Sequence, residues 1–172
     1  MVMLPAMVTD ADRAVVTLQL GREPRTLRGI AVRCPFGAPA VTEQSPYGVD
    51  DEPFPTTYYL TCMHLVAAVS RLEAAGGVER WSEASRTDPT LAASLAAGDE
   101  EQRSLRKELA GDAVGNDGGA SLEYGIGGSR GGGSLKCLHA HVAFALARPG
   151  YELGERILAE VEPRWPEQCC SR

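Results

Sequence analysis

The sequence GIGGSRGGGSLKCLHAH occupies residues 125–141 and brings together a thiol, an ammonium group and two of the chain's three imidazoles. Glycine destabilises the interior of a helix, so this run is not expected to be helical, whereas Ser134 is a suitable N-cap. The stretch therefore predicts a helix that begins just after Ser134 and continues to about Ala147, where Pro149 follows closely. The reactive side chains would then lie at the beginning of this helix.

Cys137 is the residue of this stretch that is most plainly suited to a chemical role. In a first helical turn, unpaired backbone N–H groups and the helix dipole favour an anion, as does the neighbouring Lys136. Cys137 is therefore a candidate thiolate, although a small buried core residue fits the same position. Helical spacing places His141 on the face of Cys137 and His139 nearly opposite. A shared metal ion would take Cys137 with His141, and Cys137 with His139 only if the first turn is distorted.

The composition fits one cytoplasmic domain. The 172 residues carry a formal net charge of −6, which argues against nonspecific nucleic-acid binding because phosphate neutralisation requires a basic surface. No stretch approaches the roughly 20 apolar residues that span a bilayer, and the N-terminus lacks the pattern of a secretory signal. Five cysteines without such a signal favour metal-binding, reactive or buried thiols over a disulfide framework.

The pattern of apolar residues predicts an α+β fold in a single domain over residues 1–172, mostly helical with a small antiparallel sheet. Strands are predicted at residues 27–33 and 56–61, whereas residues 12–20 fit either a strand or a helix. The glycine-rich segment 111–133 is expected to be a flexible loop, and residues 166–172 a loose tail. Further helices are predicted at residues 62–75, 78–86, 89–110 and 151–162.

Two more cysteines lie at the boundaries of predicted elements. Cys34 is in segment 33–39, whose prolines and glycine exclude a helix or a central strand, and rigid loops of this kind often carry ligands. Cys62 begins a predicted helix and so repeats the arrangement of Cys137. We therefore expect the three thiols to converge on a zinc ion or an iron–sulfur cluster. The candidate metal ligands are Cys34, Cys62, Cys137, His139 and His141, with a tail cysteine, Cys169 or Cys170, as a further option.

A second hypothesis is a thiol-dependent enzyme that acts on an anionic substrate. Cys137 would be its nucleophile and His139 its base. The candidate substrate-binding cations are Arg33, Arg130 and Lys136. A third hypothesis is an interaction module in which the cysteines and histidines only pack.

Several short blocks of the sequence, in the order in which they occur, resemble a known protein family. They are Arg33-Cys34-Pro35 with Gly37 and Pro39, Pro53-Phe54-Pro55-Thr56, Tyr58-Tyr59-Leu60-Thr61-Cys62, Ser70-Arg71-Leu72-Glu73-Ala74, and Lys136-Cys137-Leu138-His139-Ala140. Together they resemble a bacterial family, widespread in actinobacteria, known as domain of unknown function 501. The resemblance implies a bacterial cytosolic protein with no established activity, and it marks Cys34, Cys62, Cys137 and His139 as motif residues.

The resemblance also implies a genetic setting, and this chain departs from the family's pattern at two places. Genes of the family often neighbour those of a divisome septum component and of an exopolyphosphatase, which implies a link to cell-division or polyphosphate proteins. Trp165 and the terminal cysteines resemble the family's tail. Many members carry a second cysteine where this chain has Phe36, and the long glycine insertion before Lys136 also departs from the pattern.

Overall fold

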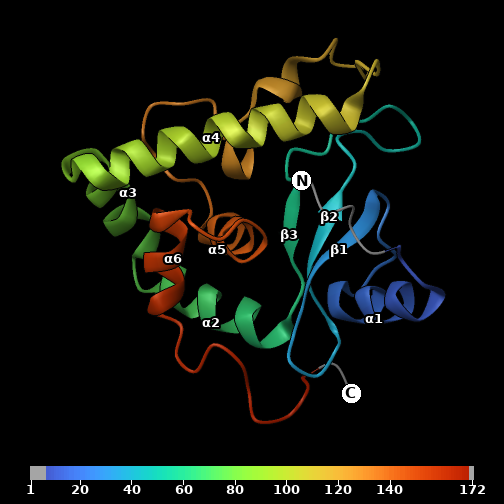
Figure 1. Cartoon of the computed structure of the whole chain (residues 1–172), viewed down its shortest axis with the longest axis horizontal. Helices are drawn as coiled ribbons and strands as arrows, with labels where there is room; N and C mark the ends of the chain where they lie inside the picture. The colour runs from blue at the N-terminus through green and yellow to red at the C-terminus, as the bar shows by residue number, and fades with distance from the viewer. Residues whose placement is uncertain (1–6, 171–172) are drawn as a thin grey trace.

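A three-stranded antiparallel sheet has helices on both sides in the computed structural model, which describes residues 7–170 (Figure 1). Strand β1 (Leu27–Arg33) pairs with β2 (Pro39–Gln44), and β2 pairs with β3 (Tyr58–Leu60). The predicted α+β fold, mostly helical with a small antiparallel sheet, is confirmed. The two ends of the predicted domain, residues 1–6 and 171–172, lie outside the described residues.

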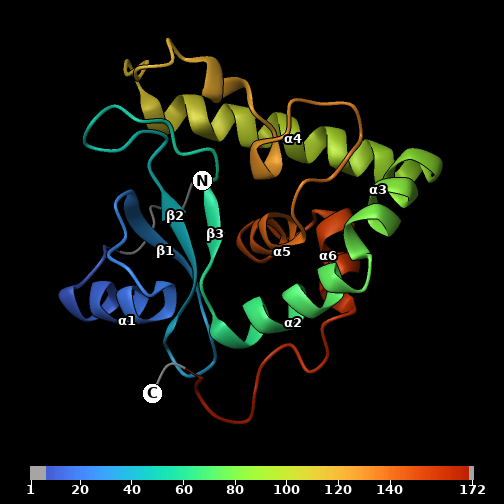
Figure 2. The same cartoon turned by 180° about the vertical axis from the view of Figure 1, so that it is seen from behind.

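The helices surround one central member. They are α1 (Asp10–Leu20), α2 (Met63–Ala74), α3 (Gly77–Thr87), α4 (Pro89–Ala110), α5 (Leu138–Ala147) and α6 (Glu152–Ala159). Helix α1 lies on one side of the sheet, and the other helices lie on the opposite side (Figures 1 and 2). Helix α5 is between β3 and α6 and also contacts α2, and seven of its residues are buried (Figure 2). It therefore forms the centre of the core.

Helix α1 occupies the segment for which the sequence left strand and helix open. Thr9 and Asp12 form a reciprocal capping box at its beginning, which satisfies backbone donors of the first turn. Gly21 ends the helix with a positive φ of 68°. Val15 and Val16 alone would favour a strand, but the caps at both ends stabilise the helix instead.

The central strand β2 was not predicted from the sequence. It begins at a proline, it includes polar residues, and all six of its residues are buried. Its polar side chains are satisfied within the sheet: Gln44 accepts from Thr26 Oγ1 at 2.7 Å and donates to Thr42 Oγ1 at 2.7 Å. A buried polar strand of this kind lacks the alternation by which half-buried strands are found.

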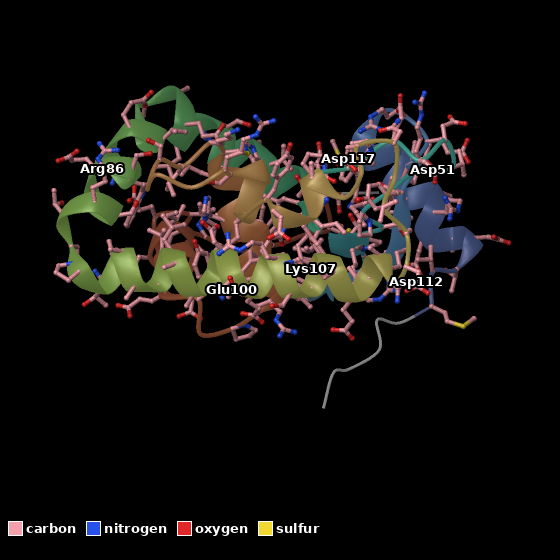
Figure 3. All side chains as sticks on the ribbon, turned by 90° about the horizontal axis from the view of Figure 1, so that it is seen from above. Asp51, Arg86, Glu100, Lys107, Asp112 and Asp117 are labelled. Carbon is pink, nitrogen blue, oxygen red and sulfur yellow. The ribbon has the colours of Figure 1, made fainter. Side chains whose placement is uncertain are left out.

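The glycine-rich segment 111–133 folds back towards the core through two short 3₁₀ turns, η1 (Ala120–Glu123) and η2 (Ile126–Gly128). Asp99 in α4 accepts a hydrogen bond from Ile126 N at 2.8 Å, and the Ile126 side chain is buried. At the far end of α4, the segment meets the connector 46–55, where Asn116 N donates to Asp51 O at 2.9 Å. Figure 3 shows Asp51 and Asp117 together at this end of the molecule.

The length and composition of a helix determine whether it can span a membrane. Within residues 7–170, no helix combines the length and apolar character needed to cross a bilayer.

Candidate functional site

Helix α5 begins three residues later than the sequence predicted. Leu138 is its first residue, and Cys137 is the N-cap, with an extended backbone at φ −158° and ψ 120°. The expected N-cap, Ser134, lies before this point. Leu135 is buried, and its N–H donates to Ser82 Oγ of α3 at 3.0 Å. This contact holds the preceding residues against α3 and delays the start of the helix.

The later start changes which side chains meet. The expectation that His139 points away from Cys137 assumed that both residues are helical, and it is wrong because Cys137 is extended. The donor atoms of Glu73, Cys137 and His139 lie within 4.8 Å of one another. The expected pairing of Cys137 with His141 is not found, because His141 is turned into the core.

Glu73, in the last turn of α2, is the third member of this group. Its Oε1 accepts a hydrogen bond from Leu138 N at 2.7 Å and lies 3.2 Å from His139 Nδ1. One carboxylate therefore caps the N-terminus of α5 and contacts the imidazole. Sequence reasoning missed Glu73 as a functional residue, although it lies in one of the blocks that carried the family resemblance. We call Glu73, Cys137 and His139 the Glu–Cys–His group.

The imidazole of His139 is also held at its other nitrogen. Nε2 lies 3.2 Å from Val66 O and 3.2 Å from Ser70 Oγ, both in α2. Because a carbonyl oxygen only accepts, Nε2 carries a proton in this arrangement. Helix α2 thus supplies contacts to both ring nitrogens and fixes the orientation of the ring.

The surroundings of His139 favour its charged form. Burial alone would lower the pKa of this imidazole, but the Cys137 thiol and the Glu73 carboxylate outweigh burial and raise the pKa to about 9. Without a metal ion, His139 is therefore an imidazolium at neutral pH. A positive charge is favoured at this point because two acidic donors converge on it.

Two members of the Glu–Cys–His group, Cys137 and His139, line a cavity of about 370 Å³. Its walls come from the end of α1, from β3 with its flanking threonines, and from the first turn of α5. Leu20 and Val66 contribute apolar surface to its lining. A small molecule in this cavity would therefore contact the thiol and the imidazole.

The three thiols expected to share one metal do not form a single group. Among residues 7–170, the Glu–Cys–His group is the only set of three or more Cys, His, Asp or Glu donors that lie within 4.8 Å of one another. Cys62 precedes α2, whereas Glu73 is in the last turn of that helix, about 16 Å further along. Cys62 instead lies 3.7 Å, sulfur to sulfur, from Cys170. Cys34 is at the turn between β1 and β2.

His141 is a core residue. Its ring is 1% exposed, and Nδ1 is 2.7 Å from the hydroxyl of Tyr151, with the two rings stacked. Burial lowers the pKa of His141 to about 4, so the ring is neutral at physiological pH. It therefore does not join Cys137 at the candidate site.

The three cations expected to bind a substrate lie elsewhere. Arg33 forms an ion pair with Asp12, at 2.7 Å, and Arg130 donates to Tyr124 Oη at 3.0 Å and stacks over that ring. Lys136 is exposed. None of the three lines the cavity beside Cys137.

Residues 30–159 match the model of the family described as protein of unknown function (DUF501). The chain belongs to the DUF501 family. Comparisons of this DUF501 protein with curated proteins and with solved structures found no match. The matched region extends from within β1 to the end of α6 and contains all three members of the Glu–Cys–His group.

Proposed function

We propose that this DUF501 protein binds a divalent transition-metal ion, zinc by preference, through Glu73, Cys137 and His139. One thiolate, one imidazole and one carboxylate are a ligand set that zinc accepts. The group contains a single thiolate, which argues for a mononuclear zinc site over an iron–sulfur cluster, because such clusters are usually held by several cysteines. The arrangement of the two nitrogens of His139 is the observation that carries the proposal.

The Nδ1 atom of His139 lies at a suitable distance from Glu73 for the two residues to share a zinc ion. Zinc bonds to nitrogen and oxygen of about 2.0–2.1 Å at the tetrahedral angle place two ligand atoms about 3.3 Å apart. The distance between His139 Nδ1 and Glu73 Oε1 is 3.2 Å. These two atoms are thus already separated by about one edge of a zinc tetrahedron.

The other ring nitrogen of His139, Nε2, donates its proton to a backbone carbonyl of α2. Histidines that ligate metals usually donate the other ring N–H to a carbonyl or carboxylate, which fixes the tautomer and the ring orientation. His139 has this support from Val66 O, and Glu73 is itself fixed by the N–H of Leu138. Both ligands therefore have the outer hydrogen bonds expected around a metal.

A proton occupies the imidazole nitrogen that a metal would need. The pKa of His139, raised to about 9, reports the attraction of Glu73 and Cys137 for a cation. Zinc binding would displace this proton, so the affinity should rise with pH through the neutral range. Three protein ligands beside a cavity leave one coordination position for water or a substrate, as in catalytic zinc sites.

A reducing compartment suits this proposal. We place the protein in the bacterial cytoplasm, where thiol ligands stay reduced. A bound zinc ion would there supply a Lewis acid or an activated water molecule.

The proposal is tested with chelator-treated full-length protein titrated with zinc against a competing chromophoric chelator. We expect one zinc per chain. Cys137→Ser, His139→Gln and Glu73→Gln should each lower the affinity by more than the roughly 10–100-fold that loss of an outer hydrogen-bond partner costs. Cobalt in place of zinc should give a thiolate-to-metal absorption band that Cys137→Ser abolishes.

Two matched variants serve as controls. Cys34→Ser changes a thiol, and His64→Gln an imidazole, outside the Glu–Cys–His group. Both should bind zinc like the unaltered protein. If folded, chelator-treated protein binds no zinc, or if the ligand variants keep full affinity, the metal site is rejected.

A metal-free thiol enzyme is the second candidate, favoured by the imidazolium beside Cys137 in the cavity. The ligand atoms of Cys137 and His139 lie within 4.8 Å of each other, and a cysteine beside a histidine is the arrangement of a thiol nucleophile with its base. Iodoacetamide labelling separates the two candidates. A reactive thiol would be labelled faster than a simple thiol in chelator, whereas a zinc ligand would be protected when zinc is added.

A further inference from the structure

Two thiols lie close together outside the Glu–Cys–His group. The sulfur atoms of Cys62 and Cys170 are 3.7 Å apart, although 108 positions separate them in the sequence. Cys62 precedes the first turn of α2 and is 2% exposed, whereas Cys170 is half-buried. Figures 1 and 2 show the C-terminal segment passing below α2 and returning towards the sheet.

Several contacts hold this C-terminal segment against the rest of the protein. Val161 is 4% exposed, and Trp165 and Cys170 pack against the core. The imidazole Nε2 of His64, in the first turn of α2, lies 2.7 Å from Pro163 O. Cys170 is thus the last of a series of contacts, and the segment delivers its sulfur to Cys62.

We propose that Cys62 and Cys170 form a reversible disulfide bond when the protein meets a small-molecule disulfide such as oxidised glutathione. A disulfide has an S–S distance of about 2.05 Å, so the sulfurs must approach by roughly 1.7 Å. Cys62 is fixed in the core, and the more exposed Cys170 would make most of this movement.

The reaction balances as two thiol–disulfide exchanges. The thiolate of Cys170 attacks one sulfur of oxidised glutathione, forms a mixed disulfide and releases one glutathione thiolate. Cys62 then loses its proton, attacks the Cys170 sulfur and releases the second glutathione. Two protein thiols are oxidised to one disulfide, and one glutathione disulfide is reduced to two thiols.

The environment of Cys62 fits the second role in this sequence. Burial, followed by the neighbouring Cys170, raises the pKa of the Cys62 thiol to about 11. The buried thiol is therefore protonated at neutral pH and is a poor first nucleophile.

The bond would attach the C-terminal segment to the beginning of α2. The later turns of the same helix contain Val66, Ser70 and Glu73, which contact His139. The inference does not depend on metal binding, because neither Cys62 nor Cys170 belongs to the Glu–Cys–His group.

The test uses the full chain in glutathione buffers of increasing oxidised fraction. Remaining thiols are alkylated under denaturing conditions, and the peptides are mapped by mass spectrometry without reduction. We expect one intramolecular link between Cys62 and Cys170, a rise in Tm of about 5–10 °C, and reversal of both by dithiothreitol. Cys169→Ser should retain the link and the Tm shift, whereas Cys170→Ser should lose both.

Other outcomes would overturn the inference. A bond between Cys169 and Cys170, a link from Cys62 to Cys169, or a Cys62 that stays fully alkylated while Cys170 carries glutathione would each do so. Cys62→Ser alters a buried position and can reduce stability by itself. Cys170→Ser, near the end of the described chain, therefore decides the matter even if Cys62→Ser fails to fold.

Discussion

At the scale of single residues, Glu73 links folding to the chemistry of the site. The same carboxylate oxygen accepts the N–H of Leu138 and contacts His139. Replacing it therefore affects the beginning of a helix as well as the charge of an imidazole. This double contact is why the metal test uses Glu73→Gln, which keeps an acceptor oxygen.

The raised pKa of His139 predicts how stability changes with pH. Because the pKa is about 9 in the folded chain and 6.5 in the reference state, the charged form favours folding. This contribution is complete below about pH 6.5 and is lost as pH rises towards 9. Chelator-treated protein should lose about 1–3 kcal/mol of unfolding free energy between pH 6 and 9.

Urea denaturation at the two pH values measures this effect. His139→Gln has no titrating imidazole at this position, so its stability should change less over the same interval. Equal pH dependence of the two proteins would mean that the charge on His139 does not contribute to stability.

At the scale of elements, sequence patterns located most helices and missed those boundaries that tertiary contacts decide. The apolar stripe of α2 and the Asp88-Pro89 start of α4 were sufficient to predict both helices. The start of α5 was predicted three residues too early, because the contact between Leu135 and Ser82 joins residues far apart in the sequence. Strand β2 was missed because its burial suppresses alternation.

Gly98 marks a close approach in the middle of α4. A Cβ there would lie 2.7 Å from Tyr151 Cε2 and 3.0 Å from Ile126 Cδ1. In Gly98→Ala, this crowding should outweigh the gain in helix propensity and lower the unfolding free energy by about 1–2 kcal/mol.

Chemical denaturation of Gly98→Ala beside Ala96→Gly separates the two effects. Ala96 is exposed on the same helix, so Ala96→Gly reports propensity, a loss of about 1 kcal/mol. If Gly98→Ala proves more stable than the unaltered protein, the contact with Tyr151 is not tight.

At the scale of the whole molecule, the candidate site unites residues 66–73 with residues 137–139. Cys137 and His139 were selected from the sequence because their side chains are reactive and lie near each other at the beginning of a predicted helix. Glu73 resembled the other acidic residues of a helix surface until the fold placed it against α5. Which distant residues meet depends on the packing of α2 against α5, and local patterns do not contain that information.

Arg106 connects distant segments in a comparable way. Its fully buried guanidinium donates from Nε to Ser121 O and from Nη1 to Phe54 O, each at 2.9 Å. Arg106→Lys cannot span both carbonyls and should lower the unfolding free energy by about 1–3 kcal/mol. Arg103→Lys, at the surface pair with Glu100, should change it by no more than about 0.5 kcal/mol in the same denaturation experiment.

The position of α5 restricts the shape of any binding partner. Seven of its ten residues are buried, and Cys137 is its N-cap. The cavity of about 370 Å³ beside it, which the side chains of Cys137 and His139 line, has room only for a group of small-molecule size. A larger partner would therefore enter this cavity with a chain end, a single side chain or a small pendant group.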